Sequence, residues 1–277
     1  MNGTETLFIS DLDGTLLDSS ARLSDESLRS LNLAAEKGAA FTVATARTLA
    51  SSGIILKDLT LNFPVILMNG VLIYDFKVGE YIYKASLDKE AVQNIITLLH
   101  SCAVDAFMYT IEGEAMHTYY ERISSGAMQN FYNERKEKYY KSFSHTDDFF
   151  SLCRKDIIYF TVIDSYQRLL PIYRMVSQIK GTEVTFYSDR YSDELWYIEI
   201  FSAEASKKKA VRFLRELIKP ERIVCFGDNL NDLPMFEEAD YSVAVKNAVT
   251  AVKEKADEII DTNTENSVAK YIYEKSI

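Results

Sequence analysis

Short apolar runs that stop abruptly at polar clusters recur near both ends of this chain, and they constrain its fold more than any other feature. In the first part of the chain the runs, each with its polar cluster, are Thr6 to Ser10 before Asp11-Leu12-Asp13-Gly14-Thr15, Ala39 to Ala44 before Thr45-Ala46-Arg47, and Val65 to Met68 before Asn69-Gly70. Helical segments separate the runs, and the first of them is capped by Ser24 and ended by Gly38. This alternation predicts right-handed βαβ units and a parallel sheet.

The same alternation resumes in the last part of the chain. Ser206 can cap a helix, and the apolar run Ile223 to Phe226 ends in Gly227-Asp228-Asn229-Leu230-Asn231-Asp232. A further short strand is expected at Val243 to Val245. The polar clusters of both parts therefore follow the carboxyl ends of predicted parallel strands, and that edge of an open α/β sheet is where ligands bind.

The middle of the chain differs in composition from its flanks. Fourteen of the 18 tyrosines lie between Tyr81 and Tyr197, although strands are themselves rich in tyrosine. Long β-runs alternate there with amphipathic helices, which indicates an antiparallel sheet with helices on one face. We expect an α/β protein with a Rossmann-like parallel-sheet core formed by residues 1–80 plus 198–277, and an inserted α+β cap domain at 81–197.

Charge and composition exclude several classes of partner. The 277 residues include 41 acidic and 31 basic side chains, a formal net charge of −10, and no basic stripe that would bind nucleic acid or an anionic membrane. The sequence contains no run of 18 apolar residues, so it predicts no membrane span. Three scattered cysteines without a C-x-x-C pair are typical of a reduced protein, so we expect a cytoplasmic location. The sequence does not indicate an oligomeric state.

Two carboxylates lie two residues apart, Asp11 and Asp13, and they could take two different roles in one reaction. One carboxylate can attack phosphorus and form an aspartyl phosphate, while the other supplies and removes protons. Asp228 and Asp232 follow another predicted strand. Four carboxylates close together would form an oxygen-rich site of the kind that binds Mg²⁺. The cation would also offset the repulsion between these acids and a phosphate.

Phosphoryl oxygens need donors and positive charge in the transition state. Thr45 offers a hydroxyl and backbone N–H groups, and one of the three lysines at 207–209 could provide the charge.

Together these motifs resemble the four ordered motifs of the haloacid dehalogenase superfamily. The motifs are the Asp11-Leu12-Asp13-Gly14-Thr15 string, Thr45, a lysine before the late helix, and the Gly227 to Asp232 string. The large insertion between Asn69-Gly70 and the lysine is similar to the α+β cap of the Cof-type branch, and the resemblance covers essentially the whole chain. It departs from the common pattern at Thr45-Ala46-Arg47, where Thr-Gly-Arg is usual. A second departure is Glu204-Ala205-Ser206-Lys207-Lys208 in place of Gly-Val-Ser-Lys-Gly, so that either Lys207 or Lys208 could contact phosphate.

The resemblance implies a role for each site residue. Asp11 would be the nucleophile, and Asp13 the general acid for the leaving oxygen and then the base for water. Mg²⁺ would be held by Asp11, the backbone carbonyl of Asp13, and Asp228, with Asp232 close by as a direct or more distant ligand. The residues implied for the substrate phosphate are Leu12, Thr45, Ala46, Lys207 and Asn231, and Asn69 would help to shape the substrate mouth.

These observations predict a Mg²⁺-dependent phosphatase that acts on small phosphorylated metabolites, such as sugar phosphates, through an aspartyl-phosphate intermediate. A phosphomutase on a similar capped scaffold is the alternative enzyme. A catalytically silent regulatory protein is the alternative without an activity.

Overall fold

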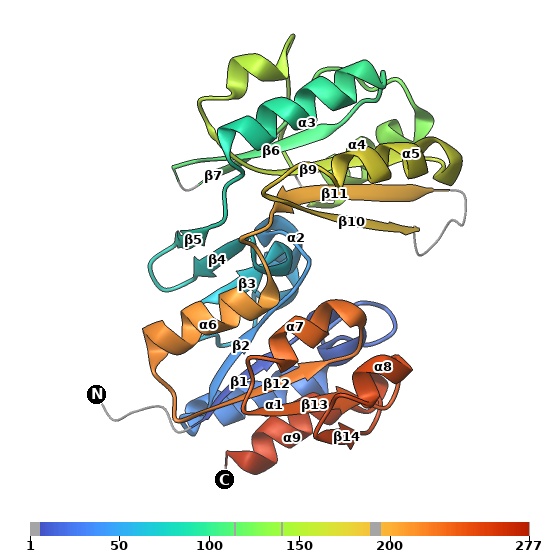
Figure 1. The fold of residues 1–277 in the computed structure, drawn as a ribbon. Helices are drawn as coiled ribbons and strands as arrows, with labels where there is room; N and C mark the ends of the chain where they lie inside the picture. Colours follow the sequence, from blue (N-terminus) through green and yellow to red (C-terminus); the bar gives the residue numbers. More distant parts are fainter. Residues whose placement is uncertain (1–5, 114, 140, 189–194, 277) are drawn as a thin grey trace. The chain divides into compact units, whose positions relative to one another are not determined.

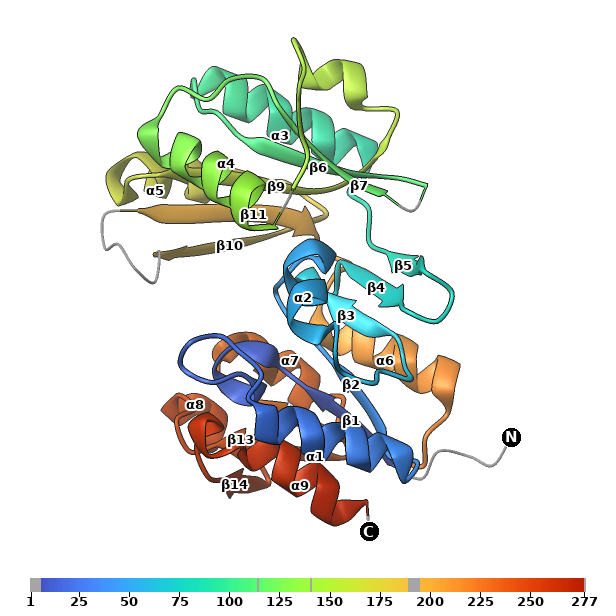
Figure 2. The ribbon, with the colours of Figure 1, turned by 180° about the vertical axis from the view of Figure 1, so that it is seen from behind.

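The computed structural model describes residues 6–113, 115–139, 141–188 and 195–276. Its chain path is drawn from two opposite sides in Figures 1 and 2. The chain forms two compact units, one built from Met1–Tyr83 and Ser206–Ile277, the other from Lys84–Ala205. Within the described ranges, no helix is both long and apolar enough to cross a bilayer.

The first unit is organised by a five-stranded parallel sheet with the order β14-β13-β12-β1-β2. Its strands are β1 Thr6–Ser10, β2 Ala40–Val43, β12 Arg222–Gly227, β13 Tyr241–Val245 and β14 Glu258–Ile260. The predicted parallel sheet is confirmed. Almost every residue of β1 and β2 is buried, as expected where both faces of a parallel sheet are covered.

Helices cover both faces of this sheet (Figures 1 and 2). One face carries α1 Asp25–Glu36 and α9 Ser267–Lys275, and the other carries α6 Lys207–Ile218 and α7 Leu233–Phe236. The short helices α2 Leu49–Leu56 and α8 Thr250–Lys253 complete the unit. The two predicted caps are confirmed, because Ser24 accepts from the Ser27 N–H and Ser206 accepts from the Lys209 N–H.

The third predicted strand starts a small separate sheet. The strands β3 Val65–Leu67, β4 Leu72–Asp75 and β5 Glu80–Lys84 form it in that order. β3 still lies parallel to β2, but through a single bridge between Ala44 and Ile66. The polar turn after β3 is thereby kept beside the turn after β2.

The second unit contains a six-stranded sheet with the order β10-β11-β9-β6-β7-β8. Its strands are β6 Phe107–Glu112, β7 Ala115–Tyr120, β8 Phe143–His145, β9 Asp156–Asp164, β10 Thr182–Ser188 and β11 Trp196–Ser202. All neighbours are antiparallel except β7 and β8. The helices are α3 Lys89–Ser101, α4 Gly126–Tyr139 and α5 Tyr166–Val176. The main apolar core of this unit lies between the sheet and the helices α3 and α5.

The prediction that the helices of this unit lie on one face of its sheet is wrong for α4. Figures 1 and 2 show α4 on the opposite side of the sheet from α3 and α5. Phe131 of α4 stacks on Phe107 of β6, with ring centroids 5.3 Å apart. Both faces of this sheet therefore carry a helix.

The expected domain boundaries need correction. The boundary at 197/198 cuts β11, which pairs with both β9 and β10 and belongs wholly to the second unit. The boundary at 80/81 falls in β5, whose residues up to Tyr83 belong to the first unit. Neither strand contains a glycine or proline that would have marked an interruption, and the two units divide instead at 83/84 and, directly before the helix cap Ser206, at 205/206.

Candidate active site

Asp11 lies at the carboxyl edge of the parallel sheet, at the end of the strand between β12 and β2. It directly follows β1, whose last residue, Ser10, is in register with Phe226 of β12 and Val43 of β2. The Asp11 N–H donates to the Phe226 carbonyl at 3.0 Å, so the residue continues the sheet for one more step. Asp11 is 5% exposed, and its carboxylate is directed into the protein by the strand.

A sharp turn after Asp11 brings Asp228 against it. Gly14 has φ +89°, and a Cβ at that position would lie 2.4 Å from Asp228 Oδ2. Only glycine combines the left-handed backbone with so close an approach. The Thr15 hydroxyl then donates to Asp228 Oδ1 at 3.2 Å. Gly14 and Thr15 therefore hold the carboxylate of Asp228, which follows the neighbouring strand β12.

Asp232 and Lys207 form the buried floor of the site. Asp232 is fully buried, and its Oδ2 accepts from the backbone N–H groups of Asp228 and Asn229 at 2.9 and 3.0 Å. Its Oδ1 accepts from Lys207 Nζ at 2.7 Å, and the same ammonium donates to Asp11 Oδ1 at 2.6 Å. Lys208 instead donates to Glu237 at 2.8 Å on the surface. Of the two candidate lysines, Lys207 is therefore the one beside Asp11.

Three carboxylates gather at this site, and the ammonium of Lys207 contacts two of them, Asp11 and Asp232. Asp11, Asp228 and Asp232 each offer an oxygen, and these oxygens lie within 4.8 Å of one another. Burial raises the pKa of Asp11 to about 8, against the opposing effect of Lys207. Burial alone would lower the pKa of Lys207, yet Asp11 and Asp232 raise it above its ordinary value. The excess of negative charge, carried by hard oxygen donors, fits a divalent cation such as Mg²⁺.

Asp13 points to a different partner. Arg47 donates to it through two hydrogen bonds, from Nε to Oδ2 at 2.7 Å and from Nη2 to Oδ1 at 2.6 Å. The side chain of Asp13 is not part of the three-carboxylate group, so only its backbone carbonyl is left as a donor toward a cation there. Arg47 was not singled out from the sequence as a site residue, although it stands in the Thr45-Ala46-Arg47 motif.

The remaining predicted residues lie on the loops around this edge. Thr45 is fully buried, and its hydroxyl accepts from the Arg47 N–H at 3.1 Å. Leu12 is also fully buried, so only its backbone can meet a phosphate. Ala46 and Asn231 are exposed, and the Asn231 amide donates to Asn69 Oδ1 at 3.3 Å.

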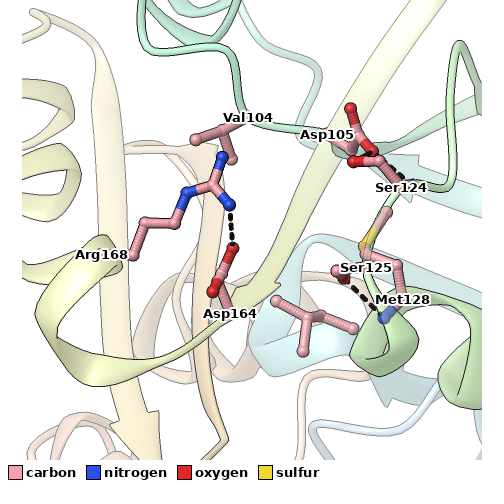
Figure 3. A pocket seen from close by; sticks show the side chains of 8 residues that line it. Val104, Asp105, Ser124, Ser125, Met128, Asp164 and Arg168 are labelled. Carbon is pink, nitrogen blue, oxygen red and sulfur yellow. Dashed lines mark hydrogen bonds and ion pairs between the residues drawn. The ribbon is translucent and has the colours of Figure 1, made fainter.

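Two hollows lie elsewhere and do not involve these residues. One, of about 360 Å³, lies at the opposite edge of the parallel sheet and is lined by residues such as Arg222, Tyr241 and Tyr271. The other, in the second unit, has room for about 10 Å³, and its polar groups pair with one another, as Asp164 does with Arg168 (Figure 3). A volume of that size holds at most one water molecule.

Comparison with known proteins identifies the family. Residues 8–272 match the haloacid dehalogenase-like hydrolases, and the chain belongs to this family. It is 28% identical over 284 residues to the 5-amino-6-(5-phospho-D-ribitylamino)uracil phosphatase YwtE of Bacillus subtilis, with 95% of each chain covered. It is 26% identical over 271 residues to the pyridoxal phosphate phosphatase YbhA of Escherichia coli, covering 95% of this chain and 96% of YbhA.

Solved structures agree with this assignment. The crystal structure of TM0651 from Thermotoga maritima superposes with a TM-score of 0.81 at 27% identity, covering 98% of this chain and 97% of that one. The predicted membership of the Cof-type branch is confirmed, and the chain is an enzyme of the phosphatase type.

Proposed function

We propose that this protein hydrolyses phosphate monoesters of small metabolites in a Mg²⁺-dependent reaction, with Asp11 as nucleophile and Asp13 as general acid and base. The observation that carries the proposal is the different environment of the two carboxylates. Asp11 is buried against Lys207 and beside Asp228, whereas Asp13 is held by Arg47. Two carboxylates in environments this different can take different roles in one reaction.

Asp11, Asp228 and the backbone carbonyl of Asp13 would hold the Mg²⁺. Both oxygens of Asp232 are already used by three donors, so we assign Asp232 the support of Lys207 and of the Asp228 loop. When bound, Mg²⁺ supplies positive charge that favours the ionised form of Asp11 and reduces its repulsion of the substrate phosphate.

The first half of the reaction transfers the phosphoryl group to the enzyme. A carboxylate oxygen of Asp11 bonds to phosphorus as the bond from phosphorus to the ester oxygen breaks, and the carboxyl of Asp13 gives its proton to that oxygen. The alcohol leaves, and Asp11 carries the phosphoryl group. Lys207, with Thr45 and Asn231, binds the phosphoryl oxygens as charge develops on them.

The second half returns the enzyme to its starting state. Asp13, now a carboxylate, takes a proton from water as the water oxygen bonds to phosphorus. The bond between phosphorus and Asp11 breaks, which releases inorganic phosphate and restores the Asp11 carboxylate. The backbone N–H groups of Leu12 and Ala46 are assigned to the phosphate as well.

The names of two relatives support the proposed class of substrate. YwtE and YbhA are named for phosphate esters of small organic molecules, and we propose substrates of this kind, sugar phosphates among them. We assign to the aromatic-rich residues 84–205 the role of a cap that selects the leaving group and excludes water. Nucleic acid and membrane partners are not proposed, and a cytoplasmic location stays a prediction.

The test is a screen of phosphorylated metabolites with Mg²⁺ in which phosphate release is measured. We expect release that EDTA abolishes and that Asp11→Asn removes. Asp13→Asn should still form a trapped phosphoenzyme from p-nitrophenyl phosphate, whose leaving group needs no proton, but should hydrolyse it slowly. Full activity of Asp11→Asn would refute the nucleophile. Isomerisation of a sugar phosphate without phosphate release would favour the phosphomutase.

A further inference from the structure

The turn between β3 and β4 has an unusual backbone. Met68, Asn69 and Gly70 follow one another with φ values of +49°, +55° and +96°. Two of these residues are not glycine, and a left-handed backbone is unfavourable for a residue such as methionine. Such a conformation persists only where its surroundings hold it, and it is found most often at functional sites.

Two backbone hydrogen bonds tie this turn to the loop after β2. The Met68 N–H donates to the Arg47 carbonyl at 3.1 Å, and the Asn69 N–H donates to the Thr45 carbonyl at 3.0 Å. The turn therefore fixes the backbone on both sides of Ala46. This is the segment that we assign to the substrate phosphate and to the orientation of Asp13.

The same turn forms the seat for the start of α6. A Cβ on Gly70 would lie 2.3 Å from the Ser206 carbonyl oxygen and 3.1 Å from the Lys207 nitrogen. Only a glycine backbone permits this approach, because its φ is positive and no side chain intervenes. Lys207 donates one hydrogen bond to Asp11 and one to Asp232. Its position therefore depends on the close contact between the start of α6 and Gly70.

The Asn69 side chain reaches a third segment. Its Oδ1 accepts from the Asn231 amide at 3.3 Å, and Asn231 belongs to the loop after β12. Three consecutive residues of one turn thereby contact the three segments that carry Thr45, Lys207 and Asn231.

We propose that the turn Met68 to Gly70 is the element that positions the phosphate-binding groups, and that Asn69 is a positioning residue acting through Asn231. This inference rests on the proposed phosphatase function. The strained backbone of the turn is consistent with that role, since the turn contacts all three segments at once.

The test compares Asn69→Gly with a matched control in the same protein. Asn266, at the start of α9, has φ 59° and ψ 27°, close to the 55° and 28° of Asn69, and its side chain also makes hydrogen bonds, to Ser24 and Ser27. Glycine keeps the left-handed backbone in both variants and removes only the side chain. We expect Asn69→Gly to lower kcat/KM about fivefold, the loss of one hydrogen bond. Asn266→Gly should lower the Tm and leave kcat/KM within twofold.

A double-mutant cycle separates positioning from general loosening. In an Asn231→Ala background, Asn69→Gly should change kcat/KM less than twofold, because its partner is already gone. Multiplicative effects of the two substitutions would refute action through Asn231, as would wild-type kcat/KM in Asn69→Gly. Gly70→Ala should lower activity further by displacing the start of α6.

Calorimetry of inorganic phosphate binding in the presence of Mg²⁺ distinguishes a failure of the positioning role from a failure of the proposed function. Weaker phosphate binding by Asn69→Gly than by wild type supports the positioning role, and equal binding refutes it. Wild-type protein that neither binds phosphate nor turns over any phosphoester would refute the proposed function itself.

Discussion

Replacing Asp232 by Asn should destabilise the protein through a mismatch between donors and acceptors. Three donors face its carboxylate from two sides: Lys207 Nζ at one oxygen and two backbone N–H groups at the other. An amide has one oxygen, so in either orientation its NH₂ group must face a donor. The loss is at least one hydrogen bond to a charged group in a fully buried position, about 2–4 kcal/mol.

The assay is chemical and thermal unfolding of Asp232→Asn beside a matched control, Asp240→Asn. Asp240 also accepts from a backbone N–H and a cation, those of Ile223 and Arg215, but both donate to the same oxygen, Oδ2, at 2.7 and 3.1 Å. An asparagine oxygen can keep both contacts, so the control should lose at most about 1 kcal/mol. We expect Asp232→Asn to lower the Tm by roughly 3–7 °C.

A second readout addresses the assignment of Asp232 as a support. Asp228→Asn should raise the Mg²⁺ concentration for half-maximal activity much more than Asp232→Asn, whose main kinetic effect should be a lower kcat/KM as Lys207 loses its place. Equal stability of the Asp232 and Asp240 variants would contradict the donor argument. A greater loss of Mg²⁺ affinity in Asp232→Asn than in Asp228→Asn would make Asp232 a direct ligand.

Three further outcomes are expected. Arg47→Lys keeps the charge but cannot form two parallel hydrogen bonds, so kcat/KM should fall about tenfold at nearly constant Tm; unchanged kinetics would remove Arg47 from the mechanism. Gly14→Ala places a Cβ 2.4 Å from Asp228, whereas Gly38→Ala, at a similar φ of +95°, meets nothing within 4 Å. Both should lower the Tm, but only the first should weaken Mg²⁺ activation, by about tenfold or more. In metal-free protein the Asp11 pKa is raised to about 8 from 3.8, so between about pH 4 and pH 8 the unfolded state releases a proton that the folded state keeps, and the free energy of unfolding should fall as pH rises. Urea denaturation with EDTA should show that this part of the slope is absent in Asp11→Asn, and an identical slope in both proteins would contradict the shift.

The carboxyl edge of the sheet could be predicted because it depends on backbone periodicity. Asp11 follows β1 and Asp228 follows β12, and these strands are neighbours in the sheet. Parallel strands end at the same edge, so placing the strands also placed the acids. The resemblance favoured Lys207, but the residues alone left Lys208 open, since the choice between the two lysines depends on the exact first residue of α6.

Contacts that depend on the direction of a side chain could not be predicted from the sequence. Arg47 and Asp13 lie 34 residues apart, and their spacing does not specify that they pair. The boundary at 197/198 was wrong because β11 reads as a continuous strand, and only its pairing with β9 and β10 assigns it to the second unit. The left-handed Met68 was likewise hidden, since the turn residues Asn69 and Gly70 come only after it and methionine itself is no turn signal.

The charge of this site favours a bound cation independently of any relative. Asp11, Asp228 and Asp232 bring three carboxylates together, and the ammonium of Lys207 contacts two of them. A phosphate monoester adds further negative charge, so its approach to an ionised Asp11 would be opposed. The raised pKa of Asp11 is the response of the protein without a metal: the carboxyl tends to stay neutral, and a neutral carboxyl is a poor nucleophile. A divalent cation held by Asp11 and Asp228 would offset both effects, so on the proposed mechanism we expect the Mg²⁺ requirement to be strict for the chemical step as well as for substrate binding.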